Sequence, residues 1–525
     1  MGNWQSAIED ALARAGLSSA RCLACDVCCR FSTPVAAFIP FFSAAEIAAL
    51  DEGGGQWTVD SRPWKTKIPG SPHCPLPTVH CLLSTAGPFL CPGRSPGEHA
   101  LPVATADGCR CPFFRLDTGR CSIYENRPLD CRLYPFVLMF DATGKEVWLA
   151  VDEVCPVAFE KVGDPEFAQA LDEVAGLLEG PLADTVAAGP GLVSVHQEQS
   201  AVRRIRVLPE VTRRVCRSDL GLARLVTTGY PALKDYFAAR PTCLAGHAFP
   251  SMVLWGDTFN LHWKIEADCL LVLAEDGGVS FLMAPPLGTG DLPRALAAAR
   301  ELMAAINGPR SGARVQEVDE ELLPLFAAES WQVGHRASEY VYSTEALATL
   351  RGRHFDGKRH DCRRFETLHR ATWRPYRSSD FPQAVGLLRR WQCERAGRHA
   401  DGFYRAQLLD SGFLHLATLR EAERLGMKGY VVDVEEDLVA YTFGFPLADG
   451  QTYADFIEVA DHAFQGLGSF VFRSFCREAP CYPFLNAGTD SDLPNLAQAK
   501  QLYRPLRIET AYTLNPPEEE MPGKG

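Results

Sequence analysis

The stretch that decides the fold of the N-terminal third is Cys109-Arg-Cys-Pro-Phe-Phe-Arg-Leu-Asp-Thr-Gly-Arg-Cys-Ser-Ile-Tyr-Glu-Asn-Arg-Pro-Leu-Asp-Cys-Arg-Leu-Tyr-Pro-Phe136. It complements an upstream run in which Cys22, Cys25 and Cys28 have the spacing of ligands to one metal centre. Adjacent cysteines project in different directions, so Cys28 and Cys29 face two metals, or one binds metal while the other packs. The pattern predicts two metal sites or one multinuclear cluster, with the ligands Cys22, Cys25, Cys28, Cys29, Cys111, Cys121, Cys131 and Cys155.

Size and composition limit the class of protein. A chain of 525 residues is too long for one core and should form two to four domains. Its composition, 46% hydrophobic and 22% charged, is that of a soluble globular protein. No apolar run of 18 residues and no signal-peptide pattern is seen, so we expect a cytoplasmic protein without transmembrane segments. The net charge of -13 argues against nucleic-acid binding over the whole surface but allows a local basic patch.

The cysteines are distributed unevenly, because twelve of the 19 lie before residue 156. In a reducing compartment such density indicates metal binding, and a disulfide framework is the alternative. A stretch without periodicity, residues 51–108, is expected to be an irregular insertion. Histidines and cysteines within it and at its end either form a further metal site or are spare thiols and surface histidines: His73, Cys74, His80, Cys81, Cys91, His99 and Cys109.

The neighbours of these cysteines carry a family resemblance. Gly119-Arg-Cys-Ser-Ile-Tyr124, Arg127-Pro128, Cys131-Arg132 and Cys155-Pro156, together with the Cys-x2-Cys-x2-Cys-Cys run, resemble the YkgJ-type cysteine-cluster family of zinc- or iron-chelating proteins. The resemblance covers about the first 160 residues and implies metal chelation rather than a reaction. Arg127 and Arg132 could offset the negative charge of a thiolate site, or could be ordinary surface charges.

Apolar periodicity predicts the remaining secondary structure. Helices are expected over residues 3–16, 43–50, 159–178, 218–238, 292–306, 381–397 and 404–426, the second opened by a capping box of Ser43 and Glu46. Strands are expected over residues 269–274, 279–284, 314–318, 428–434, 438–445 and 453–460. This alternation indicates two copies of a mixed sheet with helices on its faces.

The last 300 residues carry a second resemblance. Phe249-Pro-Ser-Met-Val-Leu-Trp255, Leu350-Arg-Gly-Arg-His-Phe-Asp-Gly-Lys-Arg359, Asn486-Ala-Gly-Thr-Asp490 and Tyr503-Arg504-Pro505 resemble relatives of the phosphatidylglycerol lysyltransferase C-terminal domain. That family (DUF2156) pairs two GNAT-like, acetyltransferase-type folds. The resemblance implies transfer of an aminoacyl group from charged tRNA. The best-known relatives use a lipid acceptor, but a chain without transmembrane helices is expected to use a small molecule or peptide.

Candidate catalytic residues lie between residues 486 and 500. Aminoacyl transfer needs a group that takes the proton of the acceptor and donors for the developing oxyanion. We interpret Asp490 as the residue that orients or deprotonates the acceptor, Asn486 as an amide donor, and Lys500 with Arg504 as the holders of a phosphate or carboxylate. In the alternative interpretation Asp490 caps the helix that begins near Leu493, and Lys500 lies on its solvated face.

A basic run over residues 351–377 is the candidate donor-binding segment. Interleaved aromatic residues could stack on bases of tRNA, although charge runs are also common on solvated faces. The predicted substrate- or tRNA-binding residues are Lys358, Arg359, Arg364, Arg374, Tyr503 and Arg504. Acyl-CoA is the competing donor, because GNAT folds bind its pyrophosphate at a glycine-rich helix start. Ala463-Phe-Gln-Gly-Leu-Gly468 has those glycines but Ala463 in place of Arg or Gln, so aminoacyl-tRNA is preferred.

The sequence therefore predicts an α+β, α-β multidomain protein, with an irregular metal-stabilised cysteine-rich domain followed by a tandem GNAT-like mixed-sheet pair. Zinc or iron, the latter also as an iron-sulfur cluster, is the expected cofactor. Rival hypotheses are a non-catalytic metal-binding or metal-delivery protein with a GNAT-like recognition scaffold, and a redox-active cluster that modifies a substrate itself. The predicted parts are a metal domain at 1–178, a linker at 179–205, GNAT-like domains at 206–350 and 351–515, and a loose tail at 516–525.

Overall fold

The computed structural model describes residues 4–52, 90–93, 97–105, 108–197, 201–308, 312–327, 331–398 and 402–516. The chain divides into two compact units. Unit 1 contains residues 1–228 and 377–420, and unit 2 contains residues 229–376 and 421–525. The predicted second GNAT-like domain at 351–515 therefore contains a segment that groups with unit 1. The predicted metal-site candidates His73, Cys74, His80 and Cys81 and the tail from residue 517 lie outside the described residues.

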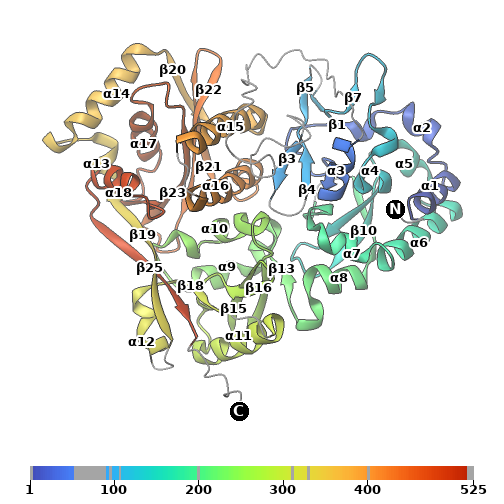
Figure 1. The fold of residues 1–525 in the computed structure, drawn as a ribbon, viewed down its shortest axis with the longest axis horizontal. Helices are drawn as coiled ribbons and strands as arrows, with labels where there is room; N and C mark the ends of the chain where they lie inside the picture. The colour runs from blue at the N-terminus through green and yellow to red at the C-terminus, as the bar shows by residue number, and fades with distance from the viewer. Residues whose placement is uncertain are drawn as a thin grey trace. The chain divides into compact units, whose positions relative to one another are not determined.

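Unit 1 combines short strands with an α-helical layer (Figure 1). Its helices are α1 (Trp4–Arg14), α2 (Ser19–Leu23), α3 (Ala44–Glu52), α4 (Leu129–Leu133), α5 (Pro156–Lys161), α6 (Pro165–Glu179), α7 (Ala183–Ala188), α8 (Pro209–Cys216), α15 (Phe381–Arg398) and α16 (Gly402–Glu421), with the 3-10 turns η1 (Val27–Cys29) and η5 (Ser218–Leu220). Its strands are β1 (Arg30–Phe31), β2 (Phe41–Ser43), β3 (Leu90–Gly93), β4 (Gly97–Ala100), β5 (Val103–Thr105), β6 (Gly108–Arg110), β7 (Phe114–Arg115), β8 (Arg120–Cys121), β9 (Phe136–Phe140), β10 (Val147–Asp152), β11 (Val193–Ser194), β12 (Val202–Val207) and β13 (Ala223–Arg224).

Local sequence signals explain several of these boundaries. The backbone N–H of Ser43 donates to Glu46 Oε2 at 2.8 Å, and the backbone N–H of Glu46 donates to Ser43 Oγ at 3.4 Å. This reciprocal pair confirms the predicted capping box at the start of α3. The other carboxylate oxygen of Glu46 accepts from the backbone N–H of Leu129 at 2.6 Å, so the same side chain also joins α3 to the start of α4.

The four-stranded sheet β11-β9-β10-β12 forms the centre of unit 1. Side chains alternate along β9, so Phe136 and Leu138 join the core that includes α1 and α6. Val137 and Met139 pack on the opposite face with Ala150 of β10. All five residues are buried, because helices and loops cover both faces of this sheet.

The described residues of the segment 179–205, which its composition suggests as a linker, are folded. They contain α7, β11 and most of β12, which pairs with β10. Leu182 and Val186 are fully buried in the main core of unit 1. Glycines and prolines follow the ends of α6 and α7, at Gly180-Pro181 and Gly189-Pro190-Gly191, so they end helices rather than form a flexible connection.

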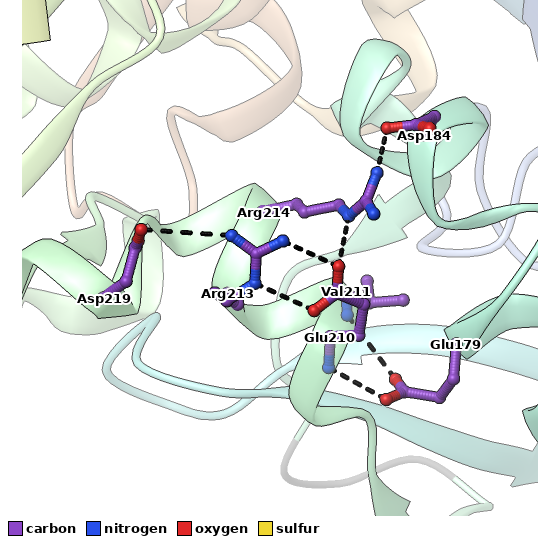
Figure 2. A network of polar contacts seen from close by, with 7 residues as sticks. All are labelled: Glu179, Asp184, Glu210, Val211, Arg213, Arg214 and Asp219. Atoms are coloured by element: carbon purple, nitrogen blue, oxygen red, sulfur yellow. Dashed lines mark hydrogen bonds and ion pairs between the residues drawn. The ribbon is translucent and has the colours of Figure 1, made fainter.

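A polar network fixes α8 beside this segment (Figure 2). Glu179, the last residue of α6, accepts from the backbone N–H groups of Glu210 and Val211 at 2.8 and 3.5 Å, so it caps the start of α8. The Glu210 carboxylate accepts from Arg213 and Arg214, and Arg214 also pairs with Asp184 of α7. Figure 2 shows that these contacts join α6, α7 and α8.

Unit 2 contains a long mixed sheet. Its helices are α9 (Tyr230–Ala238), α10 (Phe249–Leu254), α11 (Leu292–Asn307), α12 (Leu323–Ala327), α13 (Thr344–Thr349), α14 (Asp356–Leu368), α17 (Leu467–Glu478) and α18 (Pro494–Gln501). Its strands are β14 (His262–Glu266), β15 (Cys269–Asp276), β16 (Val279–Leu282), β17 (Leu287–Gly288), β18 (Val315–Val318), β19 (Gln332–Ser343), β20 (Ala371–Pro375), β21 (Lys428–Val434), β22 (Asp437–Pro446), β23 (Thr452–Ala460), β24 (Phe484–Thr489) and β25 (Arg507–Asn515).

The two α/β halves of unit 2 share one sheet with the strand order β14-β15-β16-β18-β25-β19-β24-β23-β22-β21-β20. The last strand, β25, pairs with β18 of the first half and along its whole length with β19 (Figure 1). The expected mixed α/β architecture is confirmed, with the difference that the two sheets are continuous. The predicted helix at 218–238 begins only at Tyr230, where Pro231 occupies the first turn. Within the described part of the chain, no helix is both long and apolar enough to span a membrane.

Replacing Glu179 with alanine should destabilise unit 1 by about 1 kcal/mol, because two N–H groups at the start of α8 lose their acceptor. Urea unfolding followed by circular dichroism should show a lower midpoint. Gln169→Ala, on the exposed face of the same helix, is the matched control and should change the unfolding free energy by less than about 0.5 kcal/mol. Equal effects of the two substitutions would contradict the capping role.

Candidate metal centre and candidate active site

Backbone hydrogen bonds bring the two cysteine-rich segments of unit 1 together. The N–H of Cys25 donates to the carbonyl of Cys22 at 3.1 Å, which folds the first segment into a tight turn. The N–H of Cys111 donates to the carbonyl of Cys29 at 2.9 Å, next to the β1–β6 pairing. Cys121 lies opposite Phe114 in the β7–β8 hairpin.

A cavity of about 110 Å³ lies where these segments meet. The predicted ligands that line it are Cys22, Cys25, Cys28, Cys29, Cys111, Cys121 and Cys131. Cys155, the N-cap residue of α5, lies close enough to Cys22 and Cys25 to interact with them electrostatically. The structure therefore gathers all eight predicted thiols from four separate segments.

Three of the thiols are in contact within the cavity. The Cys29 thiol is hydrogen-bonded to the thiols of Cys28 and Cys111. Among the residues that the structure describes, no three His, Cys, Asp or Glu side chains are arranged so that they could hold one ion. The ligand set thus remains a prediction, and metal binding would require that thiol–thiol contacts be replaced by thiolate–metal bonds.

The chemistry of the donor set fits a soft or borderline cation. Burial and the neighbouring Cys28 and Cys155 raise the pKa of Cys22 to about 11. Burial, followed by Asp130, raises the pKa of Cys131 well above its ordinary value. These directions have one physical cause, because thiolates crowded into a buried space repel one another and lack solvation. A bound cation would supply the compensating charge and keep the sulfurs deprotonated.

Arg127 and Arg132 both line the cavity and are not ordinary surface charges. The Glu9 carboxylate of α1 accepts from Arg132 Nη1 at 2.5 Å and from Arg127 Nη2 at 3.2 Å. Arg132 is only 7% exposed and also donates to the carbonyls of Glu125 and Arg127. The Arg127 guanidinium lowers the pKa of Cys22, against the larger opposing effect of burial. The two arginines therefore fasten α1 to the rim of the cysteine cavity.

Of the other candidate ligands, three lie within the described residues. Cys91 is opposite His99 in the β3–β4 pairing, and Cys109 is buried in β6. The His99 ring packs against Phe41, and Nδ1 lies 3.4 Å from the carbonyl of Ile39. Burial lowers the pKa of His99 to about 3, so this ring is neutral at physiological pH.

In unit 2, the candidate active site lies where two neighbouring strands separate. The parallel strands β23 and β24 are paired at Thr452–Ala454 with Phe484–Asn486. Beyond these pairs β23 continues to Ala460 and β24 to Thr489. The carbonyl of Ala487, just past the paired segment, accepts a hydrogen bond from Lys500 Nζ of α18. The ammonium group is thus held at the point where the strands separate.

Lys500 stands among acidic side chains. Burial lowers its pKa, and the carboxylates of Asp455, Glu458, Asp490 and Glu339 oppose that effect, in this order. Burial raises the pKa of Asp455 to about 6, against a hydrogen bond from Thr442 and the charge of Lys500. Burial and the neighbouring Asp455 raise the pKa of Glu458 well above its ordinary value. Four carboxylates therefore surround one ammonium group in a poorly solvated space.

Asn486 and Glu339 form the buried floor of this cluster. Asn486 is fully buried, and its side-chain amide donates to Glu339 Oε2 and, at 2.6 Å, to the carbonyl of Cys243. Its carbonyl oxygen accepts from the backbone N–H of Gly488 at 2.7 Å. Glu339 also accepts from the backbone N–H of Ala245 at 2.9 Å. Burial and the nearby Glu317 raise the pKa of Glu339 to about 7.

Asp490 accepts a 2.6 Å hydrogen bond from the hydroxyl of Tyr340. Its other carboxylate oxygen accepts from the backbone N–H of Asp492 at 3.1 Å, and its carbonyl, not its side chain, accepts from Leu493 at the start of α18. Asp490 therefore does not cap α18 through its carboxylate. Lys500 is not on a solvated face but lies near Asp490 and Glu339, and Asn486 binds Glu339. The predicted residues Asn486, Asp490 and Lys500 therefore belong to one cluster.

Sequence reasoning missed four members of this cluster: Glu339, Tyr340, Asp455 and Glu458. Glu339 and Tyr340 belong to β19, which also carries other polar residues, whereas Asp455 and Glu458 belong to β23, whose other residues except Thr452 are apolar or aromatic. Burying a carboxylate in an apolar strand is costly unless it has partners, so the acidic residues of β23 were the signal from which this site could have been found. Only the pairing of the strands shows that these side chains meet.

The residues predicted to bind the donor do not form one patch. Arg374 makes a bidentate ion pair with Asp433 at 2.6 and 3.2 Å, and Arg359 donates to backbone carbonyls near the end of α13 and to Asp356. Both arginines are thus engaged in local structure. Arg364 is exposed on α14, and Arg504 has a φ of 57° in the turn that follows α18.

Two of these residues do meet beside the cluster. Lys358 Nζ lies 4.2 Å from the centre of the Tyr503 ring, which is a cation–π distance. The Tyr503 hydroxyl donates to Ser469 Oγ of α17 at 3.2 Å. The Tyr342 hydroxyl donates to the carbonyl of Lys500 at 3.0 Å. These contacts connect α14, α17 and α18 around the position of Lys500.

The N-terminus of α17, where the glycine-rich sequence suggested a possible pyrophosphate site, is covered by α14. Gly466 has a φ of +87°, and a Cβ at this position would meet the carbonyl oxygen of Asp361. Ser469 Oγ donates to the Asp361 carboxylate at 3.5 Å. The rings of Phe365 and Phe470 lie 5.0 Å apart between the two helices. An acidic side chain and a helix thus occupy the space in front of the glycine-rich turn.

Two family models match separate parts of the chain. Residues 243–515 match the family model described as "Phosphatidylglycerol lysyltransferase, C-terminal". This match covers more than half of the chain, so the protein belongs to the phosphatidylglycerol lysyltransferase C-terminal family. Residues 21–156 match the model described as "Putative zinc- or iron-chelating domain". Both resemblances are confirmed, and the chain combines a segment that matches the chelating-domain model with a longer one that matches the lysyltransferase model.

Solved structures with similar folds each cover a little more than half of this chain. A conserved protein of unknown function from Bacteroides thetaiotaomicron is 20% identical, with a TM-score of 0.50 over 56% of this chain and 98% of its own. L-PGS from Bacillus licheniformis is 16% identical, with a TM-score of 0.41 over 56% of this chain and 93% of its own. A tandem GNAT protein from the clavulanic acid biosynthesis pathway is 12% identical, with a TM-score of 0.34, over 57% and 99%. A search of curated proteins found no match.

The pKa of Glu339 predicts a pH dependence of stability. Because folding raises this pKa from 4.5 to about 7, the carboxyl contributes most stability below pH 4.5 and loses it as the pH rises through 7. Relative to wild type, Glu339→Gln should therefore gain up to about 3 kcal/mol of unfolding free energy between pH 4.5 and 7.5. Glu301→Gln, at an exposed position of α11, is the control. A stability difference between Glu339→Gln and wild type that does not change with pH would contradict a raised pKa of Glu339.

Proposed function

We propose that unit 2 transfers an aminoacyl group from charged tRNA to a small-molecule or peptide acceptor. The observation that carries the proposal is the cluster of Lys500 with Asp455, Glu458, Asp490 and Glu339 at the divergence of β23 and β24. It lies within the part of the chain that matches the phosphatidylglycerol lysyltransferase family. The known activity of that family, named for lysyl transfer to a lipid, supports the reaction class.

The proposed reaction needs no covalent enzyme intermediate. The lone pair of the acceptor attacks the ester carbonyl carbon of the aminoacyl-tRNA, and its proton passes to a carboxylate of the cluster. The tetrahedral oxyanion collapses, the ester C–O bond breaks, and the terminal ribose oxygen leaves with that proton. Asp455 and Glu339, with pKa values of about 6 and 7, can exchange a proton near neutral pH. Lys500 is the cation available to stabilise the oxyanion.

Asp490, which the sequence suggests as the base, has a different role in this proposal. One of its carboxylate oxygens is engaged by the hydroxyl of Tyr340 and the other by a backbone N–H. We assign it to positioning Tyr340 and to balancing the charge of Lys500. Asn486 holds Glu339 in place through its amide.

The excess of carboxylates supports an aminoacyl rather than a simple acyl group. An aminoacyl group carries an ammonium at its α-carbon, and a buried excess of negative charge is stabilised by a cation. An acetyl group offers no such charge. Asp361 and α14 cover the N-terminus of α17, so a carboxylate lies where the pyrophosphate of acyl-CoA would be expected. This arrangement also favours aminoacyl-tRNA over acyl-CoA as the donor.

For unit 1 we propose binding of zinc or iron by Cys22, Cys25, Cys28, Cys29, Cys111, Cys121, Cys131 and Cys155. The thiols lie around or beside one cavity, with Arg127 and Arg132 at its rim. The bound metal would supply positive charge and crosslinks between segments that are distant in the sequence. This crosslinking is a structural role and requires no reaction at the metal.

Asp455→Asn and Lys500→Met should each lower transfer by roughly 100-fold or more, because each removes a group used in the transition state. The measurement is formation of an alkali-stable amide from radiolabelled aminoacyl-tRNA, with a mixture of amines and peptides as acceptors. Glu478→Gln, an exposed residue that accepts from Trp373 and Tyr430, is the control and should keep wild-type activity. Acetyl-CoA is tested in parallel. If only acetyl-CoA supports turnover, the donor is acyl-CoA and not charged tRNA. If neither donor supports turnover, the non-catalytic metal-binding hypothesis is favoured.

Removal of the metal should destabilise unit 1, because the segments around the cavity lose their crosslinks. The native protein is treated with a chelator under reducing conditions, and the thermal midpoint and the number of titratable thiols are measured before and after. A lower midpoint and newly reactive cysteines are expected. Lys500→Met should keep the wild-type metal content. Unchanged order together with fully reactive cysteines in the untreated protein would contradict metal binding.

A further inference from the structure

Helix α14 packs on the rest of unit 2 with one side only. Cys362 and Phe365 of this helix are fully buried, and Phe355, directly before it, is 2% exposed. The Phe365 ring packs on Phe470 of α17. At about 3.6 residues per turn, the opposite side of the helix carries exposed residues, namely His360, Arg363, Arg364 and Thr367. The helix therefore turns a polar side to the solvent.

The acidic residues of α14 are already engaged. Asp356 pairs with Arg359, and Glu366 pairs with Arg473 of α17. Asp361 accepts a hydrogen bond at 3.5 Å from a serine hydroxyl of α17. The negative charges of this helix are therefore not available to the arginines on its exposed side.

A group of exposed arginines along α14 has no such partner. Among the described residues, no carboxylate forms an ion pair with any member of this group, which we call the α14 arginine surface: Arg351, Arg353, Arg363, Arg364 and Arg370. Of the predicted donor-binding residues, only Arg364 belongs to it. On a chain with a net charge of -13, this surface is a local excess of positive charge that favours a polyanionic ligand.

The aromatic residues interleaved with these arginines are not available to stack on bases. Phe355 and Phe365 are buried. The Trp373 ring stacks on Tyr430, with the ring centres 5.0 Å apart, and Tyr376 packs against a buried phenylalanine of β22. Proteins that bind single-stranded nucleic acid use stacking on aromatic side chains, whereas a duplex is held mainly through its backbone. The α14 arginine surface therefore fits the phosphates of a duplex.

An anionic membrane is the other polyanion that an arginine-rich helix could meet. Helices that lie in a membrane interface bury an apolar face among the lipids. The apolar face of α14 is instead packed in unit 2, and among the described residues of this helix Leu368, at 60% exposed, is the large apolar side chain that faces solvent. The observations thus favour RNA over a lipid surface.

The inner side of the same helix leads to the candidate active site. Lys358 Nζ lies 4.2 Å from the centre of the Tyr503 ring. Tyr503 follows the end of α18, the helix that carries Lys500, and is within electrostatic reach of Glu458. Helix α14 therefore connects the arginine surface on its outer side to the carboxylate cluster on its inner side.

We propose that the α14 arginine surface binds the sugar-phosphate backbone of a double-stranded RNA stem, the stem next to the charged end of the tRNA donor. This inference rests on the proposed function and adds where, and through which part of the RNA, the donor is held. Because the contacts are to phosphates, they carry no information on base sequence. The α14 arginine surface thus binds charged tRNAs without reading their bases.

The first test measures binding of a short RNA duplex to the full-length protein at several salt concentrations. Five phosphate contacts predict that the logarithm of the binding constant falls with the logarithm of the salt concentration with a slope of about 4 to 5. The double variant Arg363→Gln, Arg364→Gln should reduce this slope by about 2 and weaken binding at low salt by roughly tenfold. Arg294→Gln, at an exposed position of α11, is the matched control and should bind as wild type does.

The second test separates this proposal from the proposed function. In the transfer assay, the double variant should raise the KM for aminoacyl-tRNA and leave kcat unchanged, because the lost contacts are the same in the ground state and the transition state. A wild-type KM in the double variant would overturn the role of α14 while transfer from tRNA stands. Absence of transfer in the wild type, with duplex binding that the double variant loses, would overturn the proposed function and leave α14 as an RNA-binding surface.

Measurements on the wild-type protein cover the case in which the double variant fails to fold. A salt slope below about 2, or tighter binding of single-stranded RNA than of the duplex, would overturn the proposal. Vesicles of phosphatidylglycerol and phosphatidylcholine are tested in competition with the duplex. Binding to these vesicles without measurable binding to the duplex would overturn it in favour of a membrane surface.

Discussion

The candidate active site depends on the pairing of β25 with both β18 and β19. This strand follows α18 directly, so its pairing fixes the helix that carries Lys500. On its other side β19 pairs with β24, which places Glu339 and Tyr340 beside β24 and its Asn486. One terminal strand therefore unites the two halves of the sheet and brings an ammonium group to the place where β23 and β24 diverge.

The charge balance at that place has consequences for both stability and chemistry. Glu339 and Asp455 have pKa values raised toward neutrality, so the folded protein is less stable at neutral pH than it would be with neutral side chains there. Natural proteins retain such destabilising groups mainly at functional sites. The hydroxyl of Tyr340 and the amide of Asn486 hold two of the carboxylates in fixed positions, which is the preorganisation that proton transfer to a bound substrate needs.

Unit 1 also gathers groups whose negative charges would repel one another, but there we assign the compensating positive charge to a bound metal. Eight thiols that would repel one another as thiolates surround or adjoin one cavity, and the nearby guanidinium of Arg127 offsets only part of that charge. The Glu9 carboxylate binds both Arg127 and Arg132, which leaves little of their charge for sulfur. Bound metal would complete the balance, in contrast to unit 2, where we assign the missing positive charge to the substrate.

The sequence by itself determined the local structure and the two families. The capping box of Ser43 and Glu46 and the apolar periods of α11, β21 and β22 depend on residues close in the chain, so they could be predicted. Only the tertiary structure decided that Glu339, Asp455 and Lys500 meet, that Arg374 is paired with Asp433, and that Leu182 and Val186 are part of a core. These contacts join segments tens to hundreds of residues apart, and their formation depends on strand order and helix packing, which local patterns do not specify.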